Sequence, residues 1–294
     1  MRSSKTDMLY STRFTVLGLL RILRPKHTSR KVGRLQIVLR KLRRIAASDL
    51  AHIDKLRYVL EAAGLGSRPS AYRLRDGLSV GLRQGTTDSK VFDEIFVEQA
   101  YARCVAVLPA NLGPVTLIDL GANIGLSALF LTRALDVAQI IAVEPDPDNF
   151  GLLSENLRRT GLADRCTAIR AFAGAEHAFA ELHDSGNGAW GMRMGPLSDT
   201  GTPVLPLAAI AGLASAPIVL KCDIEGGERQ LFLHIRDWTH LIPYIFLELH
   251  REFLPVEELL ACLESSGFQW IVHGTAPAGA AIALLLLERG VQIA

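Results

Sequence analysis

The sequence is poor in cysteine, and none of its four cysteines stands in a C-x-x-C pair. Zinc knuckles and disulfide frameworks both need paired or regularly spaced cysteines, so neither is expected. This cysteine usage is typical of proteins in a reducing compartment. The sequence therefore predicts a cytoplasmic protein.

Long hydrophobic runs are also missing. The longest apolar stretches, residues 14–20 and 276–287, are shorter than the ~20 residues that a membrane-spanning helix needs. Arg21 interrupts the first stretch, and basic residues follow it instead of a small-residue cleavage site. Neither a transmembrane helix nor a signal peptide is expected.

Net charge is nearly absent from the whole chain, at +2, but it is unevenly distributed. Residues 1–60 carry fifteen Lys and Arg against three Asp, which leaves an acidic remainder. Apolar and basic residues alternate at helical spacing between 14 and 44, so residues 1–66 are predicted to form a basic helical extension. Packing on the acidic remainder is the preferred interpretation, and the alternatives are contact with an anionic membrane surface, with nucleic acid or with an acidic partner. Few aromatic residues occur here, so no nucleic-acid partner is expected.

From residue 115 onward, short apolar segments alternate with helical ones. The predicted strands are 115–119, 140–144, 167–172, 218–223 and 244–248, and helices begin near Gly125, Pro147, Gly227 and Pro255. Nearly unbroken apolar strands separated by helices indicate a doubly wound parallel sheet. The last apolar segments, 269–273 and 281–287, are close enough in sequence to pair antiparallel at its edge. The predicted class is α/β, in a domain of residues 67–294.

Two further segments lie around this pattern. Residues 72–82 predict two short strands around the turn Asp76-Gly77, and Asp88 is expected to cap a following helix.

The stretch 184–201 is rich in Gly, Ser and Asn and too long for a simple connection. It is expected to be a functional loop, in which Trp190 either closes over a ligand or anchors the loop.

The turn after the first strand suggests a nucleoside site. Gly121 and Gly125 let the backbone approach a ligand, but Asn123 replaces the middle glycine that admits a pyrophosphate, which disfavours NAD. We expect Asn123 to hydrogen-bond the ligand or nearby backbone. Glu144 ends the next strand, 23 residues after Gly121, where an acid accepts ribose hydroxyls. Asp119 would attract a cationic amine and repel phosphate, so S-adenosylmethionine fits better than NAD or ATP.

Carboxylates gather where the fourth and fifth strands end. Asp223, Glu225 and Glu228 lie within six residues, and Glu248 and His250 follow the next strand. Unpaired buried carboxylates are costly, so these groups are expected at the carboxyl ends of the strands, facing a crevice. Glu228 is interpreted more simply as an acid that favours a helix N-terminus.

Several ordered blocks resemble the FkbM family of S-adenosylmethionine-dependent methyltransferases. They are residues 82–88 with 91–92 and 95–96, then 118–125, 143–146 with 149–150 and 155–156, 220–228, and 247–250. Cys222 and Gly227 depart mildly from the family pattern, and 205–210 lacks the acids of its Leu-Asp-Asp element. The resemblance implies a seven-stranded Rossmann-like methyltransferase fold. It also implies cofactor across the first strands and methyl transfer to a hydroxyl of a sugar, polyketide or other small molecule or glycan.

Methyl transfer to oxygen needs an aligned acceptor and a base for its proton. Asp223 or His250 is the expected base, with Glu225 and Glu248 orienting the histidine or the substrate. A divalent metal held by these same four residues is the less favoured alternative. The alternative from another class is an inactive methyltransferase-fold scaffold that acts through its basic extension.

Overall fold

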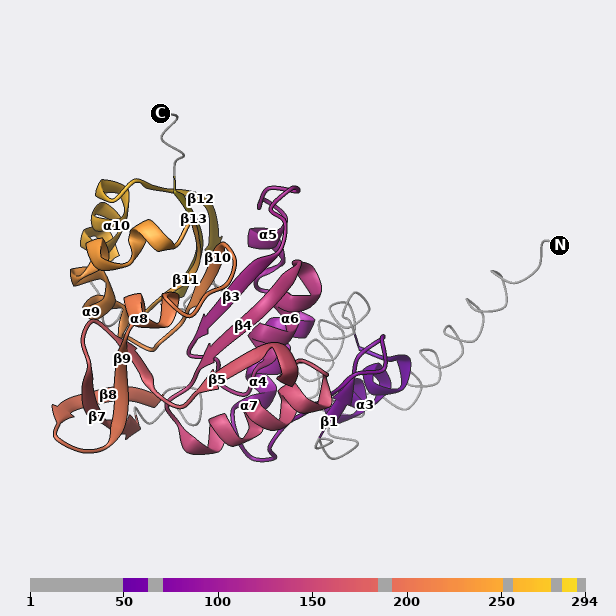
Figure 1. Cartoon of the computed structure of the whole chain (residues 1–294). Helices are drawn as coiled ribbons and strands as arrows, with labels where there is room; N and C mark the ends of the chain where they lie inside the picture. Colours follow the sequence, from indigo (N-terminus) through magenta and orange to yellow (C-terminus); the bar gives the residue numbers. More distant parts are fainter. Residues whose placement is uncertain (1–49, 63–70, 185–191, 251–255, 276–281, 290–294) are drawn as a thin grey trace, which may run out of the picture. The chain divides into compact units, whose positions relative to one another are not determined.

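The computed structural model describes residues 50–62, 71–184, 192–250, 256–275 and 282–289 (Figure 1). The chain divides into two compact units, residues 1–47 with 52–68, and residues 48–51 with 69–294. In the first unit, α3 (His52–Ala62) carries an ion pair between Arg57 and Asp54 at 3.0 Å. Most of the predicted basic extension lies outside the described residues, and the boundary at residue 66 stays a prediction.

The second unit is built on a seven-stranded sheet with the order β12-β13-β11-β10-β3-β4-β5. Its strands are β3 (Val115–Leu120), β4 (Val137–Val143), β5 (Cys166–Ile169), β10 (Ile218–Cys222), β11 (Tyr244–His250), β12 (Phe268–Thr275) and β13 (Ile282–Arg289). The five strands from β11 to β5 are parallel, and β13 runs antiparallel to both of its neighbours. The predicted α/β class, mostly parallel with an antiparallel pair at the edge, is confirmed.

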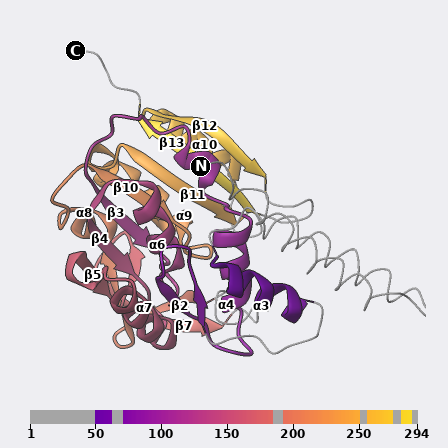
Figure 2. The same cartoon turned by 90° about the vertical axis from the view of Figure 1, so that its right-hand side faces the viewer.

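Helices cover both faces of this sheet. Figure 1 and Figure 2 show α6 (Leu126–Ala134) and α7 (Pro147–Arg159) on one face, and α8 (Leu207–Ala211), α9 (Glu228–Leu233) and α10 (Val256–Ser265) on the other. The predicted helix starts are correct to within one residue. At α7, Asp146 accepts a hydrogen bond from the backbone N of Asn149 at 2.7 Å, and Pro147 follows as the first helical residue. None of the described helices is long and apolar enough to cross a membrane.

Residues of the central strands alternate between these two helical layers. Ile118 and Leu120 of β3, with Leu220 and Cys222 of β10, belong to the core cluster that includes residues of α8, α9 and α10. The intervening positions therefore point to the face covered by α6. Two of them, Asp119 and Lys221, are charged and buried, which is unusual for central strands.

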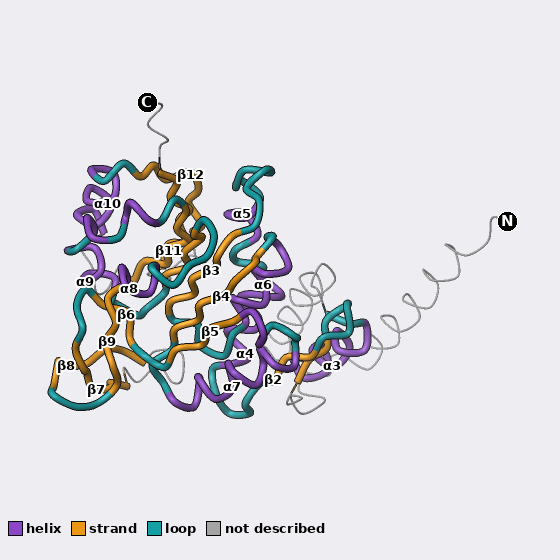
Figure 3. The backbone as a smooth tube through the Cα atoms, in the orientation of Figure 1, coloured by secondary structure: helices purple, strands orange, loops and turns teal. Residues whose placement is uncertain are grey.

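A second sheet has the order β6-β9-β7-β8 (Figure 3). Its strands are β6 (Phe172–Gly174), β7 (Ala178–Asp184), β8 (Met192–Ser198) and β9 (Thr202–Pro206). The predicted strand 167–172 is wrong as a single strand, because the exposed Arg170 ends the apolar run and Phe172 joins this other sheet. The predicted loop 184–201 is also wrong over β8, which pairs antiparallel with β7. Trp190 lies outside the described residues.

The segment before the main sheet contains β1 (Ala71–Arg73) and β2 (Ser79–Gly81), paired antiparallel as predicted. Asp76 closes their turn by accepting from the backbone N of Leu78 at 3.1 Å. Helix α4 (Asp88–Phe92) continues into a π-helical turn, η1 (Asp93–Val97), and α5 (Ala102–Val105) follows. The prediction that Asp88 caps this helix is wrong, because Thr87 holds that position and the Asp88 carboxylate instead binds Arg83.

Candidate active site

The glycine turn that follows β3 brings three chain segments together. Gly121 has a φ of +70°, and a Cβ there would lie 1.8 Å from the carbonyl oxygen of Asp223. Gly125 has a φ of +86°, and its Cβ would lie 2.8 Å from the Cδ1 of Leu153 in α7. A side chain at Gly121 would overlap the backbone of the loop after β10, and both positions need a left-handed conformation that glycine adopts at little cost. Both predicted glycines therefore set how closely the loop after β10 and helix α7 pack against the turn.

Asn123, between these glycines, also has a left-handed backbone, with a φ of +49°. Its backbone N donates to the Oε2 of Glu144 at 2.8 Å. Its side-chain Oδ1 is buried and has no hydrogen-bond partner in the described part of the chain. A buried acceptor without a donor costs about 1–3 kcal/mol, so this oxygen has capacity for a donor that the described chain does not supply.

Glu144 follows β4 and is 4% exposed. Besides Asn123, it accepts hydrogen bonds at Oε1 from the backbone N of Asp146 at 3.0 Å and from Nδ2 of Asn149 at 3.3 Å. Burial raises the pKa of Glu144 to about 7, although these three donors favour the ionised form. The carboxyl group is thus poised to gain or lose its proton near neutral pH.

Asp119 does not face an open site. It is fully buried, its Oδ1 lies 3.1 Å from the ammonium of Lys221, and its Oδ2 accepts from the hydroxyl of Ser127 at 2.6 Å. Asp119 and Lys221 are register partners on the adjacent parallel strands β3 and β10, which explains why their side chains meet. The cation beside Asp119 in this structure is therefore a residue of the chain itself.

Lys221 links the two strand ends that form the site. Its Nζ donates to the carbonyl oxygens of Leu120 at 3.2 Å and Gly121 at 2.7 Å, and lies 3.5 Å from the Oδ2 of Asp223. Burial lowers the pKa of Lys221, but the charges of Asp119, Asp223 and Glu248 outweigh it, so the net shift is upward. Lys221 is a stable ammonium that fixes the first turn.

The acids in the loop after β10 have two different environments. Glu228 is fully buried and accepts from the backbone N of Ile224 at 3.0 Å and of Gly226 at 2.7 Å. Its carboxylate holds the loop that precedes α9. This agrees with the interpretation of Glu228 as an acid that favours a helix N-terminus. Asp223 and Glu225 are partly exposed, and Glu225 has a left-handed backbone with a φ of +53°. These two carboxylates are accessible at the carboxyl end of β10.

Strand β11 supplies the other predicted residues. Glu248 is largely buried, and its charge acts on Lys221. His250 is the last residue of β11, and its side chain lies outside the described residues, so its convergence with Asp223 stays a prediction. No three His, Cys, Asp or Glu side chains come together as metal ligands in the described ranges.

Tyr101 is a buried residue of this region that the sequence does not indicate. Its ring centroid lies 6.4 Å from that of Phe130 in α6 and 6.2 Å from that of Phe246 in β11. Burial raises the pKa of the Tyr101 phenol, and the charges of Glu248 and Asp223 raise it further. The phenol stays protonated beside these acids and keeps its O–H as a hydrogen-bond donor.

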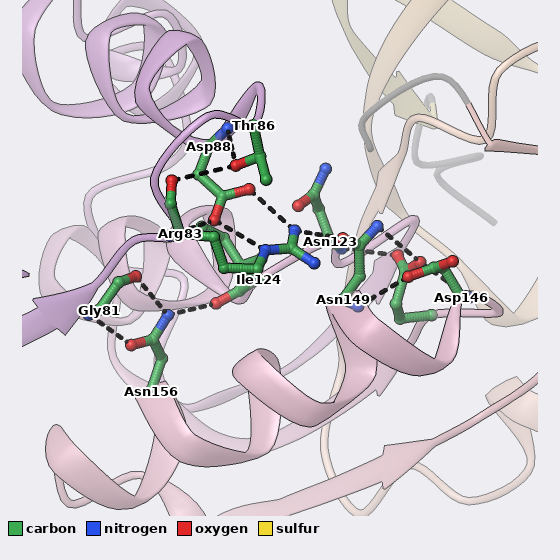
Figure 4. A network of polar contacts seen from close by, with 10 residues as sticks. Gly81, Arg83, Thr86, Asp88, Asn123, Ile124, Asp146, Asn149 and Asn156 are labelled. Carbon is green, nitrogen blue, oxygen red and sulfur yellow. Dashed lines mark hydrogen bonds and ion pairs between the residues drawn. The ribbon is translucent and has the colours of Figure 1, made fainter. Parts of the chain in front are cut away.

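A polar network connects α7 with the segment that follows β2 (Figure 4). The guanidinium of Arg83 donates to Oδ1 of Asn149 at 2.6 Å and to Oδ1 of Asp88 at 2.8 Å. Two helical turns further along α7, Asn156 accepts from the backbone N of Gly81 at 2.7 Å and donates to the carbonyl oxygen of Ile124 at 2.8 Å. The segment 81–88 is thus fastened to the glycine turn by two asparagines on one helix face.

Comparison with known proteins assigns the chain to a family. Residues 119–270, just over half of the chain, match the family described as "Methyltransferase FkbM domain". The chain belongs to the FkbM methyltransferase family.

Its curated relatives include the methyltransferase sdnD of Sordaria araneosa, which is 37% identical over 81 residues. The antimetabolite synthetase AmbE of Pseudomonas aeruginosa is 36% identical over 77 residues. The matched stretches are 28% and 26% of this chain, but only 28% of sdnD and 3% of AmbE.

Solved structures with a similar chain path include the methyltransferase FkbM of Methylobacillus flagellatus, with 18% identity and a TM-score of 0.45. That similarity covers 85% of this chain and 58% of the other. The ribosomal protein L11 methylase of Lactobacillus delbrueckii subsp. bulgaricus has 12% identity and a TM-score of 0.41, covering 65% and 77% of the two chains.

Proposed function

We propose that this chain is an S-adenosylmethionine-dependent O-methyltransferase whose acceptor is a hydroxyl on a sugar or polyketide-type natural product. Membership of the FkbM family supports the methyltransferase class. One structural observation carries the cofactor assignment: Glu144 and Asn123 bring a buried carboxylate and a buried amide oxygen to the carboxyl ends of adjacent strands β4 and β3. This is where nucleoside ligands bind in open α/β sheets.

The residues present fit an S-adenosyl group. Oε2 of Glu144 carries one of its three described hydrogen bonds and is the oxygen better placed to accept a ribose hydroxyl. A donor on the ligand would satisfy the Oδ1 of Asn123. Asp119 fits a supporting role, because Lys221 already balances its charge. The bound cofactor would supply an electrophilic methyl group on a cationic sulfur.

The chain's part in the chemistry is to align the acceptor and take its proton. The bound cofactor would supply the methyl group, and a base of the chain would take the proton of the acceptor hydroxyl. Asp223 is a candidate for this role, since its carboxylate is partly exposed and directly follows β10. His250 is the second candidate base, and Glu225 and Glu248 are proposed to orient the histidine or the substrate.

A mass-spectrometric screen tests this function directly. The purified full-length chain is incubated with S-adenosylmethionine and panels of hydroxylated sugars and polyketides, and products are searched for a gain of one methyl group. A methylated oxygen in one of these panels is the expected result. Methylation found only at nitrogen or carbon would overturn the O-methyl assignment. Failure to bind the cofactor would instead favour a scaffold.

A further inference from the structure

Arg83 is connected to the Glu144 carboxylate through one intermediate side chain, that of Asn149. Its Nη2 donates to Oδ1 of Asn149 at 2.6 Å, and Nδ2 of Asn149 donates to Oε1 of Glu144 at 3.3 Å. Arg83 lies in the segment after β2 and precedes the stretch 119–270 that matches the family. A residue from outside that stretch is therefore connected to the proposed cofactor carboxylate.

The chemistry of the three groups gives this chain of hydrogen bonds a direction. A guanidinium has only donors, so the oxygen of the Asn149 amide must face Arg83. The amide nitrogen is then left to face Glu144, where it donates to the carboxylate. Removing Arg83 removes the charged donor that holds the amide oxygen away from Glu144, so the orientation in which the amide nitrogen faces Glu144 loses that support. Arg83 thus selects the orientation in which Asn149 supports the ionised carboxylate.

Arg83 is itself held firmly. The buried carboxylate of Asp88 accepts three hydrogen bonds from Arg83. The donors are the backbone N at 2.7 Å, Nε at 3.0 Å and Nη2 at 2.8 Å. The hydroxyl of Thr86 donates to the carbonyl oxygen of Arg83 at 3.1 Å. The ionic hydrogen bond to Asp88 raises the pKa of Arg83, so the guanidinium is permanently charged. The segment is a fixed support for the Asn149 amide.

We propose that Arg83 is a positioning residue of the cofactor site, which acts through Asn149 to hold Glu144 as the acceptor of the ribose hydroxyls. This inference rests on the proposed function, because it takes Glu144 as the ribose-binding carboxylate. Among the described residues, the carboxylate of Asp146 also acts on Glu144, and its charge opposes ionisation of Glu144. Asn149 and the backbone donors of Asn123 and Asp146 act in the opposite direction.

The proposal is tested in the cofactor-free protein by following the Glu144 carboxyl carbon in an NMR pH titration. Arg83→Met removes the guanidinium, and Asn149→Asp keeps an acceptor for Arg83 but places a second acid against Glu144. Both are expected to move the midpoint of Glu144 above its value of about 7. Arg83→Lys preserves a cation near Asp88 but lacks the fork that also reaches Asn149, so it should move the midpoint in the same direction. It serves as the test if Arg83→Met does not fold.

The matched control is Arg158→Met, which removes an exposed arginine of α7 whose ion pair is with Glu155 on the same helix. It should leave the Glu144 midpoint unchanged.

Calorimetric titration with S-adenosylhomocysteine gives the second measurement. A midpoint raised by one unit reduces the ionised fraction at pH 7 about fivefold, so affinity should fall by that factor in Arg83→Met and recover toward wild type at pH 9. An unchanged Glu144 midpoint in Arg83→Met and Arg83→Lys, with normal binding by the wild type, overturns the positioning role alone. Absence of binding by the wild-type protein overturns the proposed function and the cofactor part of this inference, whatever the midpoints do.

Discussion

Lys221 and Asp119 form a buried ion pair across adjacent parallel strands, with Nζ and Oδ1 3.1 Å apart. Neither side chain is more than 3% exposed. Lys221 also donates to two carbonyl oxygens at the end of β3, so the pair is part of the turn on which the proposed cofactor site depends. The desolvation cost of burying the two charges offsets much of their Coulomb attraction, so the ion pair contributes little net stability. Its main role is to fix that turn.

Removing one member of this pair should be strongly destabilising. Lys221→Met leaves Asp119 buried without its cation, and we expect a loss of about 3–5 kcal/mol in the free energy of unfolding. Urea denaturation measures it. The surface control Arg158→Met should lose no more than about 1 kcal/mol, because exposed ion pairs contribute little. Equal losses in the two variants would contradict the buried pair.

Gly121 should not tolerate a side chain. Gly121→Ala places a Cβ against the carbonyl oxygen of Asp223 and requires a left-handed alanine. The free energy of unfolding should fall by clearly more than about 1 kcal/mol, the scale of the conformational cost alone. Gly77→Ala is the matched control, since Gly77 also has a positive φ but an added Cβ would meet no described atom within 4 Å. Indistinguishable denaturation midpoints for the two variants would refute the close approach.

Glu144 predicts a specific dependence of stability on pH. Its pKa rises from 4.5 to about 7 on folding, so the folded state binds the proton more tightly. The contribution of Glu144 to the free energy of unfolding is therefore complete below pH 4.5 and falls as the pH rises to 7. Above pH 7 it no longer changes, and the total loss is about 3 kcal/mol. Glu144→Gln should abolish that part of the decline when unfolding is measured between about pH 4.5 and pH 8. Parallel profiles for variant and wild type would show that Glu144 is not desolvated.

Asp223 is expected to matter for turnover more than for cofactor binding. Asp223→Asn removes the proposed base and should lower the single-turnover rate about 10²–10⁴-fold. Affinity for S-adenosylhomocysteine, measured by calorimetry, should change little. His250→Ala run beside it distinguishes the two candidate bases. Wild-type turnover in both variants would remove both from the mechanism.

Much of the fold can be predicted from sequence because the strands of the parallel sheet are almost wholly apolar. The helix starts at Pro147 and Glu228 are recognisable from local chemistry, namely a cap with proline and an acid at a helix N-terminus. The second sheet escapes prediction because nearly all residues of β7 and β8 are at least partly exposed, and the sequence from 184 to 201 is typical of a loop.

The sequence predicts a site residue only where that residue lies at a characteristic distance from the end of a strand. Glu144 and the glycines stand at fixed distances from a strand end, and the structure places them together. Lys221 is easily overlooked because it lies in an apolar strand, and only the register of β10 with β3 brings it to Asp119. Arg83 contacts Asn149 across 66 residues of sequence, a pairing that no local pattern contains.

The central claim is that the ends of β3 and β4 bind S-adenosylmethionine through Glu144. Calorimetric titration of the full-length wild-type chain and Glu144→Ala with S-adenosylmethionine at about pH 8 tests it most directly, because wild-type Glu144 is then mostly ionised. The wild type should bind one equivalent, and the variant should bind at least about tenfold more weakly, as expected for loss of hydrogen bonds to a charged group. Equal affinity in both proteins, or no binding by the wild type, would contradict this claim.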